Sequence, residues 1–146
     1  MKRFVVVLLV VGALAMPAAA IAAVRHFKGP VNPSGNVAFP ARVHSGKVVR
    51  VKPGFAFNHI PMTCNEGART ISGSFNFAMA VHRRHFSGAG TFTSTAGQGT
   101  VAVTGTFKHH GRRAVGTINA HGNFSPGGVT VTGCHSGSLT WHAHAS

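Results

Sequence analysis

Residues 99–107 read GTVAVTGTF and form the clearest strand pattern in the chain. Val101, Val103 and Phe107 share one parity, while threonines and an alanine occupy the other. An apolar side chain at every second position is typical of a half-buried antiparallel strand. The stretch ends in a glycine–polar–phenylalanine unit that occurs four times, at residues 73–75, 90–92, 105–107 and 122–124. The glycines of these units are 17, 15 and 17 residues apart, about one strand out and one back, so a ladder of hairpins is predicted.

Further stretches on either side carry the same kind of pattern. They predict strands over residues 36–44, 48–57, 68–81, 85–93, 99–108, 112–121, 128–134 and 137–144. A bulge or break is expected at Pro53–Gly54 and a second break near Phe77–Ala78. Residues 59–67 are expected to be irregular. Glycines that share the apolar parity are expected to let the sheet coil and pack closely: Gly73, Gly105, Gly116 and Gly133.

These strands predict an all-β fold, because no helical period is evident after the N-terminal leader. The predicted architecture is an antiparallel β-sandwich or flattened barrel of about eight or nine strands. A barrel with an open lumen is the alternative. The many large phenylalanine and valine side chains on the inward parity disfavour it, because they would fill the lumen.

Two cysteines, Cys64 and Cys134, predict one disulfide if the chain is exported, with two buried free thiols as the alternative. The bridge would stabilise the fold by about 4 kcal/mol in the chain-entropy model. It also bears on strand layout. One unbroken strand over residues 68–81 would place Cys64 at the end of the sheet away from Cys134, which is why a break near Phe77–Ala78 is expected.

The N-terminus is interpreted as a signal peptide spanning residues 1–22. Lys2 and Arg3 precede the apolar run 4–14, which is too short to span a bilayer. Small residues suit cleavage after Ala20 or Ala22. The protein is therefore expected to be secreted and extracellular, with no membrane span.

The remaining chain is expected to have two parts. Residues 23–35 hold prolines, glycines and basic side chains without an apolar period, and are predicted to form a flexible basic N-terminal arm. Residues 36–146 are predicted to form a single β-sandwich domain.

The chain has 14 lysines and arginines but only one acidic residue, Glu66, giving a formal charge of +13, or about +11 without the leader. Paired-carboxylate hydrolysis needs two acids, and a Ser-His-Asp triad would have to take Glu66 as its third member. Cysteine nucleophiles are consumed if the bridge forms. No phosphate-binding loop is present, so we predict a protein that is not an enzyme and has no cofactor.

Several basic residues fall at predicted turns. Those at one end of the hairpin ladder hold the candidate anion-binding residues, which are Arg83, Arg84, Lys108, Arg112 and Arg113. An uncompensated basic end attracts anionic cell-envelope or extracellular polymers and anionic surfaces. The alternative is that charged tips only maintain solubility and block edge pairing. Sequence-specific nucleic-acid binding is not expected, because the phenylalanines lie on the core parity and cannot stack on bases.

Histidine provides a second hypothesis, since the chain has eleven. His142 and His144 share one face of the last predicted strand, a spacing that can bind Zn²⁺ or Cu²⁺. His109 and His110 form another pair. Two exposed imidazoles are more often plain polar-face residues, because a metal site needs more ligands. A purely structural extracellular role is the remaining alternative.

The pattern as a whole resembles a group of small exported β-proteins found in actinobacteria. The resemblance covers most of residues 36–146 and lies in the leader, Pro61-x-x-Cys64, the Gly-x-Phe hairpins and a closing Cys-x-x-Gly-x-x-x-Trp-x-Ala motif that begins at Cys134. It implies an exported β-sandwich with no catalytic residues. The histidine richness departs from the group.

Overall fold

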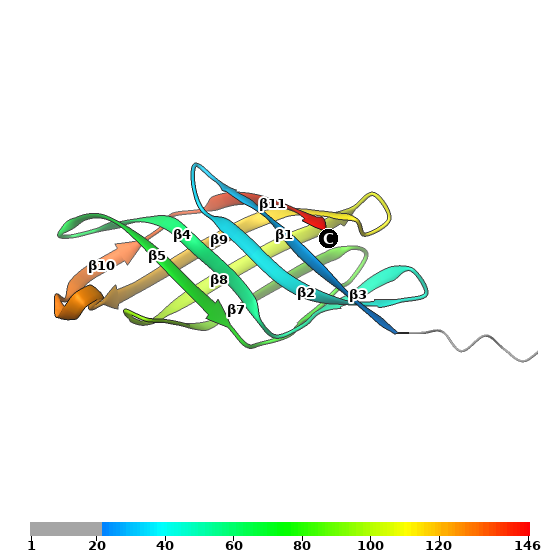
Figure 1. Cartoon of the computed structure of the whole chain (residues 1–146), viewed down its shortest axis with the longest axis horizontal. Coiled ribbons are helices and arrows are strands. Elements are labelled where there is room, and N and C mark those ends of the chain that lie inside the picture. Colours follow the sequence, from blue (N-terminus) through cyan, green and yellow to red (C-terminus); the bar gives the residue numbers. More distant parts are fainter. Residues whose placement is uncertain (1–21) are drawn as a thin grey trace, which may run out of the picture.

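The structure, a computed structural model, describes residues 22–146 (Figure 1). The predicted signal peptide lies almost wholly in residues 1–21, outside the described residues, and it stays a prediction. The described chain contains eleven strands and one short 3-10 turn, η1. Their bounds are β1 Ala23–Asn32, β2 Asn36–His44, β3 Lys47–Val51, β4 Phe55–Cys64, β5 Gly67–Phe75, β6 Met79–Ala80, β7 His85–Ser94, β8 Gly97–Lys108, β9 Arg113–Phe124, η1 Pro126–Gly128, β10 Val131–His135 and β11 Leu139–Ala145.

All strand pairs are antiparallel and belong to one sheet. Eight strands close a ring in the order β4, β5, β7, β8, β9, β11, β1 and β2, with β2 pairing again with β4. β10 bridges β9 and β4, while β3 and β6 extend from β2. The predicted all-β antiparallel fold is thus confirmed. Within residues 22–146, no helix has the length and apolar character needed to cross a membrane.

The prediction of a flexible arm over residues 23–35 is wrong, because most of this segment is β1. The strand lies between β2 and β11 and pairs with both. Phe27 and Val31 point into the core and are almost fully buried. Phe27 is the cross-strand partner of Phe39, and their rings stack with centroids 5.1 Å apart. Burial of Phe27 and Val31 holds the segment in the sheet. The prolines nearby had obscured its strand pattern in the sequence.

The expectation that residues 59–67 are irregular is also wrong. β4 continues to Cys64, and only Asn65 and Glu66 form the turn to β5. The strand was hidden by a bulge in which Asn58 and His59 together oppose one residue of β5, so the register shifts between Phe57 and Ile60. Both flanking side chains are therefore buried although they are three positions apart.

Both predicted breaks are present. β3 ends at Val51 and β4 begins at Phe55. β5 ends at Phe75, and the chain then crosses to form β6 on the edge of β3. The predicted disulfide between Cys64 and Cys134 is confirmed. The expected reason for the second break is wrong, because Cys134 lies near the end of β9 that is away from the 108–113 turn, the same end as the turn that follows Cys64.

Aromatic rings fill the interior of the ring of strands. Five of them stack nearly parallel, the first four on adjacent strands and the last in the segment after β5. Successive centroids are 5.1, 4.9, 4.9 and 4.2 Å apart in the order Phe27, Phe39, Phe55, Phe75 and Phe77. Trp141 from β11 meets Phe39 and Phe55 edge to face. Each such contact contributes roughly 0.5–1.5 kcal/mol beyond area burial. The interior is a packed core.

Glycines on the opposite wall make room for these rings. A Cβ at Gly105 would overlap the ring of Phe86, and one at Gly116 would lie 2.6 Å from Trp141 Cζ2. The inward placement predicted for these glycines and for Gly73 is confirmed. Gly133 differs because it is exposed, has a φ of 59° and lies where the register of β10 shifts. Its backbone conformation, rather than close packing, calls for glycine there.

The end of the molecule that holds the disulfide is also held by the lone carboxylate. Glu66 accepts hydrogen bonds from the Thr132 backbone N–H at 2.8 Å and from the Thr132 hydroxyl at 2.9 Å. These donors, the backbone N–H first, lower the pKa of Glu66 below its ordinary value. The carboxylate therefore ties β10 to the β4–β5 turn. Its contribution is complete above the ordinary carboxyl pKa and is lost as pH falls through the lowered value.

Substituting Gly105 by alanine should destabilise the fold, because the added methyl must displace the Phe86 ring. Overpacking of this kind costs roughly 1–3 kcal/mol in the free energy of unfolding. Denaturant titration measures it. The matched control is Ala102→Ser on the exposed face of the same strand, which should change stability by less than about 0.5 kcal/mol. Equal stability of the two variants would contradict this packing.

Glu66→Gln should lower the melting temperature at pH 7, because the amide cannot replace both carboxylate acceptors. The difference from the unsubstituted protein should shrink in strong acid, where Glu66 is itself protonated. Thermal unfolding followed by circular dichroism at both pH values tests this. Lys52→Gln, which removes an exposed charge elsewhere, serves as the control. A deficit of the same size at both pH values would show that the carboxylate is not the stabilising species.

Candidate anion-binding site at the basic end

Three turns meet at one end of the molecule, on the right of Figure 1. They are residues 44–47 between β2 and β3, residues 82–85 between β6 and β7, and residues 108–113 between β8 and β9. We call these three segments the basic end. All five predicted anion-binding residues lie in it and are exposed: Arg83, Arg84, Lys108, Arg112 and Arg113.

The opposite end of the molecule carries the turns next to Glu66, to Thr95 and to η1. β8 runs from one end to the other and is twelve residues long, which corresponds to ~36 Å. The chain's single acidic side chain is thus separated from the basic end by the length of the strands. The charge is distributed unevenly, with its cations concentrated at one end.

Hydrogen bonds to backbone carbonyls hold two turns of the basic end, at residues 82–85 and 108–113, in place. The N–H of Phe107 donates to the Arg84 carbonyl at 2.9 Å, which joins the 82–85 turn to β8. The Arg25 guanidinium from β1 donates to the Gly111 carbonyl at 2.6 Å. The basic side chains are therefore presented by turns that are fixed to the ring of strands.

Arg83 and Arg84 occupy a turn conformation that ordinarily selects other residues. His82 and His85 exchange two backbone hydrogen bonds of 2.8 Å, so only two residues close the hairpin. Their φ angles are 47° and 74°. Positive φ at both central positions is the requirement of a type I′ turn, for which Asn-Gly is preferred. Arginine in this region costs about 1 kcal/mol or more per residue.

The neighbouring turn repeats this feature with histidines. His109 and His110 have φ angles of 49° and 55°, and Gly111 donates its N–H to the Lys108 carbonyl at 3.0 Å. Two adjacent turns thus hold large basic or imidazole side chains at positions where asparagine or glycine would be unstrained.

A row of basic residues continues from the basic end across the outer face of the sheet. Successive cross-strand partners on β8, β9, β11 and β1 are Lys108, Arg113, His144 and Lys28. All four are exposed. Adjacent strands are about 4.8 Å apart, so the row spans ~14 Å. We call it the basic row. Sequence reasoning missed Lys28, because it placed this residue in a flexible arm.

The predicted metal pair overlaps this row, because His144 belongs to it. His142 and His144 are exposed on β11 with ring centroids 6.2 Å apart. The guanidinium-bearing Arg113 is the direct partner of His144. Among residues 22–146, no group of three or more histidine, cysteine or acidic side chains comes together. The described residues thus bring together two imidazoles and a neighbouring guanidinium.

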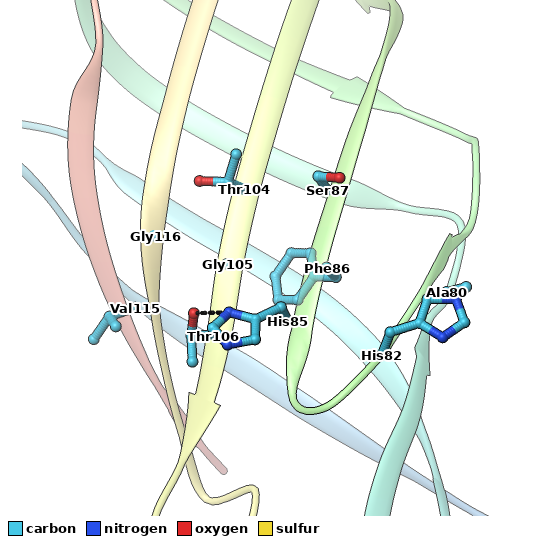
Figure 2. A pocket seen from close by; sticks show the side chains of 10 residues that line it. All are labelled: Ala80, His82, His85, Phe86, Ser87, Thr104, Gly105, Thr106, Val115 and Gly116. Atoms are coloured by element: carbon cyan, nitrogen blue, oxygen red, sulfur yellow. Dashed lines mark hydrogen bonds between the residues drawn. The ribbon is translucent and has the colours of Figure 1, made fainter.

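A shallow hollow of about 550 Å³ opens next to the 82–85 turn and is shown in Figure 2. Its hydrogen-bonded pair is His85 Nδ1 and Thr106 Oγ1, 2.9 Å apart. In Figure 2, Ser87 lies on the far side of Phe86 as seen from His85. The His85 imidazole is therefore paired with the Thr106 hydroxyl and not with Ser87. The lining residues come from β6, the 82–85 turn and β7 on one side and from β8 and β9 on the other.

A second cavity, of about 630 Å³, lies between the three turns of the basic end. We call it the turn cavity. It is more enclosed than the hollow next to His85. The residues that line it come from all three turns and from β3 and β8: Gly46, Lys47, Val48, Val49, Val81, Arg83, Arg84, Phe107, His109, His110 and Gly111. Sequence reasoning did not identify Lys47 or the valines, because no local pattern indicates that the β2–β3 turn meets the other two.

No protein-family model, curated protein or solved structure matches the chain. The placed cations, the two strained turns and the turn cavity are therefore the features from which a function must be inferred.

Proposed function

We propose that this protein is an exported, non-catalytic β-domain that binds anionic polymers through its basic end. The observation that carries the proposal is the convergence of five exposed cations from two turns on one end, continued by the basic row. A linear polyanion can lie along the row and contact several cations at once, releasing its counterions. Acidic envelope or extracellular polysaccharides have this repeated charge.

The strained turns favour binding over a simple role in solubility. A charged loop tip that only prevents aggregation can adopt any relaxed conformation. Arg83 and Arg84 instead sit at positive φ, where Asn-Gly would be more stable. Backbone strain of this kind clusters at binding and catalytic sites, where it fixes side chains in place. The strain therefore supports a role for these two arginines in contacting a ligand.

The distribution of aromatic residues favours electrostatic binding without sequence readout. In the described part of the chain, every phenylalanine and the tryptophan are buried or partly buried inside the ring of strands. None is available as a platform on which nucleic-acid bases can stack. Affinity would come from charge pairing, and it would fall steeply with salt.

Replacing the strained arginines with the preferred turn residues, as Arg83→Asn with Arg84→Gly, should change stability and binding in opposite directions. Stability should rise by about 1–2 kcal/mol, because the turn no longer holds strained residues. Heparin affinity should fall, and the slope of log Kd against log salt should become shallower by about one to two. Salt-gradient elution from immobilised heparin, titration at several salt concentrations and denaturant unfolding measure these effects.

The matched control is Lys52→Ser with Arg69→Ser, which removes the same two charges outside the basic end. It should elute from heparin later than the turn variant. Equal losses in the two variants would mean that net charge alone decides retention, and the proposed site would be rejected.

A further inference from the structure

The turn cavity has a composition that a purely polymer-binding surface does not need. Its apolar lining, which we call the floor, consists of Val48, Val49, Val81 and Phe107. Phe107 is buried in the core, whereas 39% of Val49 is exposed, one of the few large apolar side chains with such exposure in residues 22–146. The Val81 N–H donates a hydrogen bond of 3.2 Å to the Val49 carbonyl, which joins the segment before the 82–85 turn to β3. The floor is thus an apolar surface built by three separate segments.

The rim of the same cavity is cationic. Lys47, Arg83 and Arg84 line it together with His109 and His110, and no acidic side chain is among the lining residues. Arg83 and Arg84 lie in one strained turn and the two histidines in the other, so the rim is held in place from both sides. The chain's only acidic side chain, Glu66, lies in the β4–β5 turn at the opposite end of the molecule. No acidic side chain lines the cavity to neutralise these cations.

A polymer with charge on every repeat cannot use this floor, because placing ionic groups against valine and phenylalanine side chains carries a desolvation cost. A ligand with one anionic head and one apolar tail can use both parts. The tail would cover the valines and the head would meet the arginines. The cavity volume of about 630 Å³ lies within the range of small-ligand pockets, roughly 300–1,000 Å³.

We propose that the turn cavity binds an anionic amphiphile, with the head group at Lys47, Arg83 and Arg84 and the tail against Val48, Val49 and Val81. The proposal rests on the proposed function, because both assign a ligand contact to Arg83 and Arg84. The apolar floor of the cavity plays no part in polymer binding. Free fatty acids and anionic membrane lipids share this head-and-tail chemistry.

The test uses laurate below its micelle concentration, with butyrate and dodecyltrimethylammonium as comparison probes, in isothermal titration calorimetry on the mature chain. Laurate should bind saturably. Butyrate should bind at least about tenfold more weakly, because it covers little of the floor. The cationic amphiphile should not bind, because the rim repels its head group. Equal affinity for laurate and dodecyltrimethylammonium would overturn the proposal.

Val49→Ser separates this site from the polymer-binding surface. It should weaken laurate binding by about tenfold while leaving heparin elution unchanged. The control is Val129→Ser, at an exposed valine near η1 at the opposite end of the molecule, which should change neither. Both positions are exposed, and melting temperatures verify that the variants fold. Identical laurate affinities of the two variants would overturn the cavity proposal without affecting polymer binding.

Vesicles containing phosphatidylglycerol distinguish the two sources of amphiphile. Vesicle association that Val49→Ser weakens would assign the tail to a membrane lipid. Laurate binding accompanied by vesicle association that is insensitive to Val49→Ser would assign it to a free amphiphile. Vesicle association insensitive to Val49→Ser, together with no laurate binding, would reject the cavity as a site for either.

Discussion

Stacked phenylalanine rings inside a closed ring of strands are the interaction on which the rest of the molecule depends. Phe27, Phe39 and Phe55 are cross-strand neighbours on β1, β2 and β4, and their rings stack within a few degrees of parallel. So much aromatic volume fits only because glycines such as Gly105 and Gly116 line the opposite wall. The sheet closes around a packed core because large aromatic rings on one wall face glycines on the other.

Closure of the sheet determines which turns meet. β8 and β9 are both twelve residues long and pair along their length, so their connecting turn reaches the same end as the turns at residues 44–47 and 82–85. The opposite end is fastened by the Cys64–Cys134 disulfide and by Glu66. Structural anchors and the lone acid thus gather at one end, while cations gather at the other. This separation gives the protein a directional field that its net charge alone would not.

Local sequence patterns predicted the strands whose alternation is uninterrupted. The 99–107 stretch lies within β8. The break after Phe75 was expected on the premise that Cys134 lies at the end of the 108–113 turn, whereas the short β10 holds it at the opposite end. The N-terminal strand was missed because prolines obscure its alternation and because its partner β11 lies at the far end of the chain, a pairing that no local pattern encodes. The bulge at Asn58 and His59 similarly shifted the parity of β4.

The candidate site was predictable only in part. The arginines were identified from their positions in turns, because charge is visible in sequence. The basic row was not, because it requires β1 and β11 to be adjacent. The turn cavity was not either, since the valines of β3 have an ordinary strand pattern. Positive φ at Arg83 and Arg84 also left no signal, because type I′ turns are recognised in sequence by asparagine and glycine.

We propose that the location of the cations, rather than their number, determines binding. The most direct measurement is heparin elution of a variant that moves two charges to the opposite end, with Arg112→Ser and Arg113→Ser combined with Thr95→Arg and Gln98→Arg. The introduced positions are exposed and flank the β7–β8 turn, and the net charge stays the same. We predict elution at lower salt than the unsubstituted protein. Elution at the same salt concentration would contradict the account.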